Sequence, residues 1–372
     1  MHILITGAYR LFFPVAGLFA ALVIPIWLLL YSGVDLALPA DGLRWHRHEM
    51  LFGYLSLALG GFLLTAIPNW TGRAALRGAP LVGLLALWLA GRAGLALMPA
   101  GALQAALALG FPVALAALAS REIWAGGNRR NLPVAALVWL FAGADALFLA
   151  GHEALAQRAG FGLALILITL VGGRVTPAFS RNWLKARGHT PGIPVFGRFD
   201  AVAMGAAIAA VLGWIVLPDQ LVTGGLALLA AVLLALRLAR WKAWSVAAEP
   251  LLLALHMGYA WLPVSFALIA AQTLGSGVDE IQVAHAVGAG AVGGMTMIVM
   301  IRAVLGHANR PIAGNGLDVA ILGAVHLGAA LRVIAPVFGD PMLPIHLSGA
   351  IWALGFAGFF LRYGRIALLP RQ

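Results

Sequence analysis

Histidine is the residue type in this sequence with the clearest chemical potential. Seven of the ten histidines fall in, or at the ends of, long apolar runs: His46, His48, His152, His256, His285, His326 and His346. Ionisable side chains are costly inside a bilayer, so they are functional candidates there by default. Imidazole is a common ligand of haem iron and of copper. With no cysteine in the chain, thiolate-bound metal is excluded, and a haem or copper site built from histidine is predicted.

Depth along the predicted spans sorts these histidines into two levels. Most lie near the outer ends of their spans, whereas His256 and His326 lie nearer the middle of spans that run in the same direction. We therefore expect two metal levels, with His256 and His326 able to meet across a cleft. Hydrogen bonding at the membrane interface is the main alternative for His152 and His346. A buried polar helix contact is an equal alternative for His326.

The spacing around residue 48 limits which side chains can share a metal. His46 and His48 are two residues apart, so on a regular helix they point about 200° apart. His46, Glu49 and Met50 share one face at i, i+3 and i+4. Together they offer an imidazole, a carboxylate and a thioether, a set that suits copper. Glu49 could also carry protons for a site that consumes them.

A glycine-rich stretch follows His285, with glycine at 288, 290, 293 and 294. Missing side chains there would let a flat macrocycle lie against the backbone, with His285 as an axial ligand. Arg174 and Arg332 would then pair with haem propionates. Two alternatives stay open. In the first, the glycines serve helix packing alone. In the second, Arg174, Arg302 and Arg332 only snorkel or bind helix carbonyls.

The elements that carry these residues are membrane spans. Hydrophobic residues make up 62% of the 372 residues and charged residues 10%, which excludes soluble and disordered proteins. The apolar runs show no period-two alternation, so a barrel is excluded. We predict an all-α, polytopic membrane protein of about 12 transmembrane helices. The predicted spans are about 11–31, 45–68, 81–98, 102–119, 133–152, 161–180, 200–217, 221–239, 249–273, 280–304, 316–338 and 342–361.

Arginine and lysine predict the orientation. They gather in alternate loops, which places both termini in the cytoplasm. The net charge of +11 is therefore a topological signal, and no nucleic-acid partner is expected. The chain reads as one transmembrane domain over 1–372. It could divide into two six-helix halves, about 1–180 and 200–372, joined by the basic segment 181–199.

Four stretches together resemble the NnrS family: WHRHEMLFGYLSLALGGFLLTAIPNWTGR, GGRVTPAFSRN, LHMGYAWLPVSFAL and AHAVGAGAVGGMTMIVMIRAVLGHANRP. The resemblance covers essentially the whole chain. It implies a multi-pass protein of the bacterial cytoplasmic (inner) membrane that holds haem, of b type, and copper, and that acts in the nitric oxide response, in denitrification or nitrosative-stress defence. The motif positions are His46, His48, Glu49, Arg174, His256, His285, Arg302, His307 and Arg310.

Three functional hypotheses follow. The first is a haem/copper protein that binds nitric oxide, a small apolar molecule that partitions into lipid. Quinol could supply electrons and protons for its reduction, with Glu49 as relay. Sequence leaves open whether the protein is an enzyme, a nitric oxide reductase-like oxidoreductase, or only a binder. The second is a transporter of a metal, haem or small solute. The third is a structural factor whose histidines only pack helices.

Overall fold

The computed structural model describes residues 3–36 and 41–369, and the described part is helical without strands. It contains twelve helices long and apolar enough to cross a membrane, which confirms the predicted fold class. The spans, with the helices that form them, are α1 (Ala8–Tyr31), α2–η2–α3 (Gly42–Thr71), α4 (Ala79–Leu97), α5 (Ala102–Ala125), η3–α6 (Arg129–Leu149), α7 (Glu153–Ala186), α8 (Arg198–Val216), α9 (Leu221–Ala239), α10 (Pro250–Thr273), α11–η5–α12 (Glu280–His307), α13–η6 (Gly316–Val337) and α14–η7–α15 (Met342–Leu368).

Polar side chains at the helix starts satisfy backbone N–H groups that have no partner within the helix. Asp41 accepts a hydrogen bond from the Leu43 N–H before α2. Glu249 caps α10 in the same way and also accepts from the Gly314 N–H at 2.8 Å. Such caps help to fix where these two spans begin. At the other end of α3, Gly72 adopts a left-handed conformation with φ of 70° and ends the helix, as glycine does without steric cost.

The described residues form two compact units that interleave along the sequence. Unit 1 takes its residues from 1–160, 300–311 and 356–372, and unit 2 from 161–299 and 312–355. The long helices α7, α12 and α14 each contribute to both. The prediction of two consecutive six-helix halves divides the chain differently and stays a prediction.

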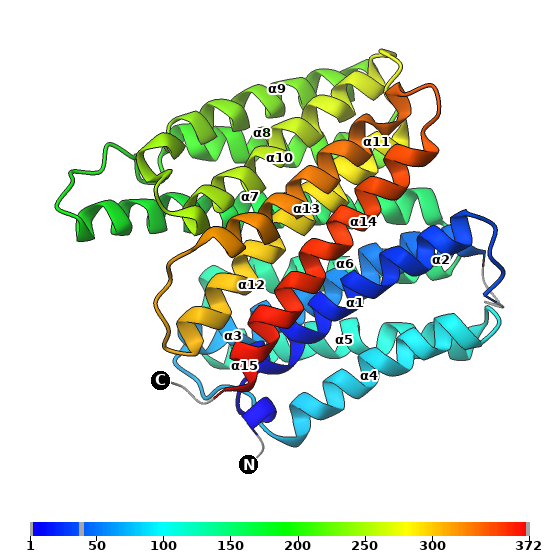
Figure 1. Cartoon of the computed structure of the whole chain (residues 1–372), viewed down its shortest axis with the longest axis horizontal. Helices are drawn as coiled ribbons and strands as arrows, with labels where there is room; N and C mark the ends of the chain where they lie inside the picture. The colour runs from blue at the N-terminus through cyan, green and yellow to red at the C-terminus, as the bar shows by residue number, and fades with distance from the viewer. Residues whose placement is uncertain (1–2, 37–40, 370–372) are drawn as a thin grey trace. The chain divides into compact units, whose positions relative to one another are not determined.

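Within unit 1, α1 packs against α3, and α4 and α5 form a hairpin (Figure 1). Glycines allow the close approach of aromatic rings: a Cβ at Gly61 would fall 2.5 Å from the ring of Phe13. The Arg10 guanidinium also donates to the carbonyls of Ala367 and Leu369. The two ends of the chain are therefore tied together in this unit.

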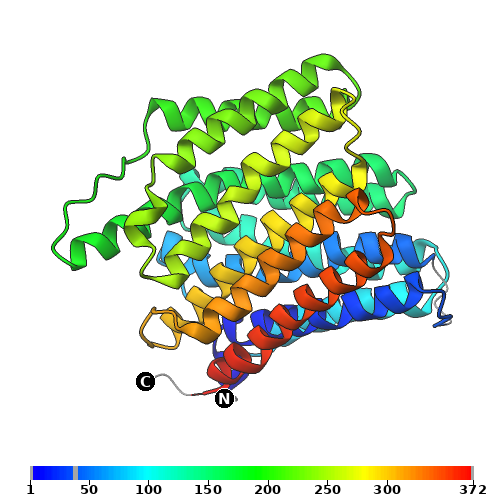
Figure 2. The ribbon, with the colours of Figure 1, turned by 45° about the horizontal axis from the view of Figure 1, so that its top comes forward.

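Within unit 2, α8, α9 and α10 lie side by side in both views (Figure 2). The segment η5 contacts α10 and α13.

Among the residues that the structure describes, three stretches are π-helical: η2 (Glu49–Tyr54), η5 (Ala286–Val292) and η7 (Phe360–Gly364). Short π-helical insertions are rare and often occur at functional sites. η2 directly follows His48, and η5 directly follows His285. The stretches that contain His48 and His285 thus both carry this distortion.

Candidate functional site

In unit 1, four ionisable side chains from three spans form a line. His48, at the end of α2, is 2% exposed, and its Nε2 lies 2.8 Å from Oδ1 of Asp145 on α6. The other ring nitrogen, Nδ1, lies 3.6 Å from Oε1 of Glu49. The second oxygen of Glu49, Oε2, lies 3.4 Å from Nη1 of Arg92 on α4. The order is Asp145, His48, Glu49, Arg92.

The contacts along this line differ in kind. Only the one between His48 and Asp145 has hydrogen-bond length, and the Asp145 carboxylate accepts from the ring N–H at Nε2. Nδ1 is then the nitrogen free to accept a proton. The two contacts of Glu49 are longer and electrostatic. Its carboxyl oxygens are buried and have no hydrogen-bond partner among the described residues, an arrangement rare enough to mark a site.

The π-helical segment makes room for this line. A Cβ at Gly53 would fall 2.6 Å from Oε2 of Glu49 and closer still to Arg92 Nη1. The Gly53 carbonyl accepts from Trp88 Nε1 at 2.9 Å and from the Ser56 hydroxyl at 3.0 Å. Side chains of α3 and α4 therefore both bind the carbonyl of this glycine. Any larger residue at position 53 would separate Glu49 from Arg92.

His46 points away from this line. Its ring stacks on Trp27 of α1, with centroids 4.6 Å apart and planes 13° from parallel. The predicted opposite directions of His46 and His48 are confirmed by these neighbours. The predicted copper face of His46, Glu49 and Met50 assumed a regular helix, whereas Glu49 and Met50 lie in the π-helical segment. Within 3–36 and 41–369, no three His, Asp or Glu side chains converge as a metal site would require, and copper stays a prediction.

In unit 2, two motif histidines are held in the same way. His256 Nδ1 lies 2.9 Å from the Leu252 carbonyl, and His285 Nδ1 lies 2.7 Å from the Ile281 carbonyl. A carbonyl can only accept, so Nδ1 carries the proton and Nε2 carries the lone pair. Metal-binding histidines are commonly oriented by such a bond from the other nitrogen. His346, outside the motifs, bonds the Met342 carbonyl in the same way.

His326 is held in the opposite sense. Its Nδ1 accepts a 3.1 Å hydrogen bond from Trp261 Nε1, so Nε2 carries the proton in the neutral ring. His256 instead faces Trp241, whose ring is 6.4 Å away. Trp261 lies five positions after His256, which places the two residues about 140° apart around α10. His256 and His326 therefore lie in two separate environments. The expectation that they meet across a cleft is wrong.

The glycines after His285 pack against side chains rather than lining an open slot. A Cβ at Gly290 would fall within 3 Å of the Trp261 ring, one at Gly294 2.5 Å from His326, and one at Gly293 3.0 Å from Trp352. The Trp352 indole also donates to the Ala289 carbonyl at 3.2 Å. These contacts favour the packing interpretation of the glycines over the macrocycle slot.

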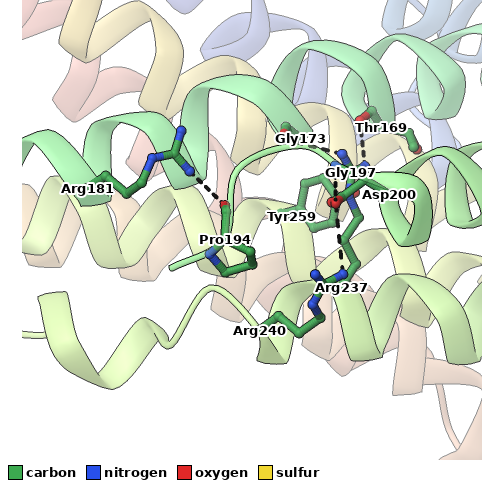
Figure 3. Close-up of polar contacts among 9 residues, drawn as sticks. All are labelled: Thr169, Gly173, Arg181, Pro194, Gly197, Asp200, Arg237, Arg240 and Tyr259. Carbon is green, nitrogen blue, oxygen red and sulfur yellow. Dashed lines mark hydrogen bonds and ion pairs between the residues drawn. The ribbon is translucent and has the colours of Figure 1, made fainter. Parts of the chain in front are cut away.

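A second buried ion pair joins four helices of unit 2 (Figure 3). Arg237 Nε lies 2.8 Å from Oδ1 of Asp200, and the two side chains are 1% and 5% exposed. Arg237 Nη1 also donates to Tyr259 Oη at 2.9 Å and to the Thr169 carbonyl at 3.1 Å. Asp200 accepts from the Gly197 N–H at 3.0 Å. Both side chains of this pair have further hydrogen-bond partners, which is typical of a structural role.

Comparison with known protein families identifies the family of this chain. The family model described as NnrS protein matches residues 3–371. The chain belongs to the NnrS family. This membership, with the twelve spans, makes it a multi-pass membrane protein of the nitric oxide response in general terms. No curated protein matches the sequence.

His307 and three arginines singled out from the sequence have other environments. His307 is the last residue of α12, and its ring stacks on Tyr9 with centroids 5.2 Å apart. It is therefore a packed helix-end residue and not the loop residue that its position suggests. Arg174 is exposed on α7, whereas Arg302 and Arg332 are half-buried. All three take part in polar or ring contacts. The pairing of Arg174 and Arg332 with haem propionates stays a prediction, as do the cofactor-binding role of Arg302 and the ligand role of His307.

Two members of the line in unit 1 were not predicted from the sequence. Asp145 and Arg92 are isolated charges within the apolar runs AGADALF and LAGRAGLAL. The rule that singled out the histidines applies equally to them. Arg237, within the predicted span 221–239, is likewise a buried charged residue that the sequence did not single out.

Proposed function

We propose that this NnrS protein binds haem through single histidines and binds nitric oxide at that haem. The observation that carries the proposal is the common arrangement of His256 and His285. Each donates its Nδ1–H to the carbonyl four residues earlier, which leaves Nε2 as the coordinating atom. His256 Nε2 is buried and has no hydrogen-bond partner among the described residues, so a ligand there would satisfy an otherwise orphaned atom.

The donor set fits haem better than copper. Haem iron needs one or two axial imidazoles, and the structure presents histidines one at a time. Haem held there would supply a binding site for nitric oxide. A copper site needs several donors together, so no step is derived through copper.

The line in unit 1 suits proton handling. Arg92 Nη1 lies 3.4 Å from Oε2 of Glu49, and Asp145 fixes the His48 tautomer in which Nδ1 faces Glu49. A proton on Glu49 Oε1 can pass to His48 Nδ1 once the 3.6 Å gap shortens. In this proposal His48 is a proton carrier. A ligand role for His48 would have to use Nδ1, with Asp145 behind it.

Reduction of two nitric oxide molecules to nitrous oxide and water consumes two electrons and two protons. Quinol is the proposed donor of both, with the histidine–carboxylate line as the path for protons. Binding alone requires neither, so turnover with quinol is a separate step of the proposal with its own test.

The test of haem binding uses the full-length protein in detergent. Pyridine-haemochrome assay and absorption spectra, with and without nitric oxide, should show a Soret band that persists through gel filtration and shifts with the gas. His256→Ala and His285→Ala should lose most haem, whereas His189→Ala, in an exposed loop, should keep it. Colourless wild-type protein would contradict the proposal and favour the carrier alternative. If both variants kept the haem content of the wild type, His256 and His285 would not be the haem ligands.

A further inference from the structure

Unit 1 contains a pocket that the proposed function does not use. It has a volume of about 340 Å³ and lies between the end of α3, the segment that follows it, and the last turns of α5. Leu64, Ile67 and Leu118 form part of its wall, and Arg73, Arg77 and Arg121 form its polar rim. One pocket thus joins an apolar wall to a cluster of three arginines.

The rim keeps a positive charge after its internal ion pairs are counted. Glu122 binds Arg73 at 2.6 Å and Arg121 at 2.7 Å. One carboxylate therefore holds two guanidinium groups in place, and Arg77 adds a third on the same rim. Three arginines against one glutamate leave a net charge of +2, which favours an anionic ligand. The shared carboxylate also reduces the freedom that the arginines would lose on binding.

Tryptophans mark the level of the pocket in the membrane. Trp70 lies one residue before Thr71, the last residue of α3, and Trp124 lies two residues after Glu122 with 76% of its surface exposed. Tryptophan is enriched at the membrane–water interface, so the arginine rim lies at headgroup level. Leu64 and Ile67 lie two and one turns before the end of α3, which places the apolar wall on the hydrocarbon side.

We propose that this pocket binds an anionic phospholipid, with its phosphate on the arginine rim and the start of an acyl chain on the apolar wall. Basic pockets between transmembrane helices are known to bind anionic headgroups. A volume of 340 Å³ equals that of about eleven water molecules at roughly 30 Å³ each. That exceeds what one inorganic phosphate fills, so the apolar wall favours a lipid over a free anion.

The test measures which lipid the purified full-length protein retains. Lipid-depleted protein is equilibrated with mixed micelles of equal phosphatidylglycerol and phosphatidylcholine, and bound lipid is quantified by mass spectrometry after gel filtration. Wild type should be enriched in phosphatidylglycerol, and millimolar inorganic phosphate should not displace it. Equal retention of both lipids would overturn the proposal. Displacement by phosphate would overturn it in favour of a free-anion site.

Matched variants separate the pocket from general surface charge. Arg73→Gln/Arg77→Gln should weaken phosphatidylglycerol binding about 30-fold, since each arginine at a membrane surface contributes about 1 kcal/mol. Arg129→Gln/Arg130→Gln removes the same charge from exposed residues outside the pocket and should change binding less than about twofold. Equal losses in the two double variants would contradict the proposal.

A third variant tests the pocket without changing its charge. Ala75→Trp fills it, because Ala75 is part of the lining. The variant should lose phosphatidylglycerol selectivity while it elutes as the wild type does. A folded Ala75→Trp protein that keeps the selectivity would refute the pocket as the site, and it decides the question even if the arginine variant does not fold.

Discussion

Replacing Asp200 by asparagine should lower the free energy of unfolding by about 3 kcal/mol, because it leaves the buried Arg237 cation without its counter-ion. The value lies at the lower end of the range for broken buried ion pairs, since Arg237 keeps its bonds to Tyr259 and Thr169. Arg237→Met should cost a similar amount. It leaves Asp200 with the Gly197 N–H and with Arg240 Nη1 at 3.8 Å.

The double variant separates the pair from its surroundings. In a protein that already lacks Arg237, replacing Asp200 removes a charge without a partner. The losses of unfolding free energy in the two single variants should therefore not add in the double variant. We expect a coupling of about 2 kcal/mol or more, which exceeds the roughly 0.6 kcal/mol average of single hydrogen bonds between membrane helices. Reversible unfolding in mixed micelles with dodecyl sulfate, followed by circular dichroism, measures each variant.

Asp219→Asn is the matched control. It removes one carboxylate from the exposed turn before α9 and should change stability by less than about 0.5 kcal/mol. Additive losses in the Asp200/Arg237 double variant would refute a direct coupling between the two side chains. An unchanged Asp200→Asn protein would show that the pair does not hold α8 and α9 together.

Three further substitutions test the other features. Glu49→Gln should slow nitric oxide consumption by quinol-supplied vesicles by about 10²-fold, the typical contribution of a positioned proton donor, with Glu280→Gln unchanged; equal rates would remove Glu49 from proton transfer. His46→Ala should lower copper more than iron in elemental analysis, and unaltered copper would end the prediction of copper at this residue. Gly290→Leu should destabilise by about 1–3 kcal/mol through overpacking against Trp261, whereas Gly323→Leu, which meets open space, should not. Equal melting temperatures for these two variants would contradict the packing interpretation.

The spans were predictable from sequence because apolar length alone specifies them in a membrane protein. The prediction failed locally where polar residues extend a helix beyond its apolar run. α7 begins at Glu153, about eight residues before the predicted start, because Glu153, Gln157 and Arg158 lower the hydropathy of a helix that nevertheless continues through them.

The partners within the site could not be predicted, because pairing depends on which faces the packed helices present. The spacing of His46 and His48 predicted their opposite directions, since this depends only on helix geometry. Nothing in the sequence pairs Asp145 with His48, whose positions are 97 residues apart. The π-helical segments likewise have no sequence pattern that a period of 3.6 would reveal.

The π-helical segment Glu49–Tyr54 has a consequence for how the chain can change over evolution or in the laboratory. Such a segment acts as one residue added to an otherwise regular helix, so it rotates everything before it by about 100° relative to everything after it. Deleting a single residue there would turn the His48 ring out of reach of Asp145, while α3, which follows the π-helical segment, kept its packing. An alignment gap of one position at this place would thus signal the loss of the ionisable line even in a chain whose every named side chain is retained.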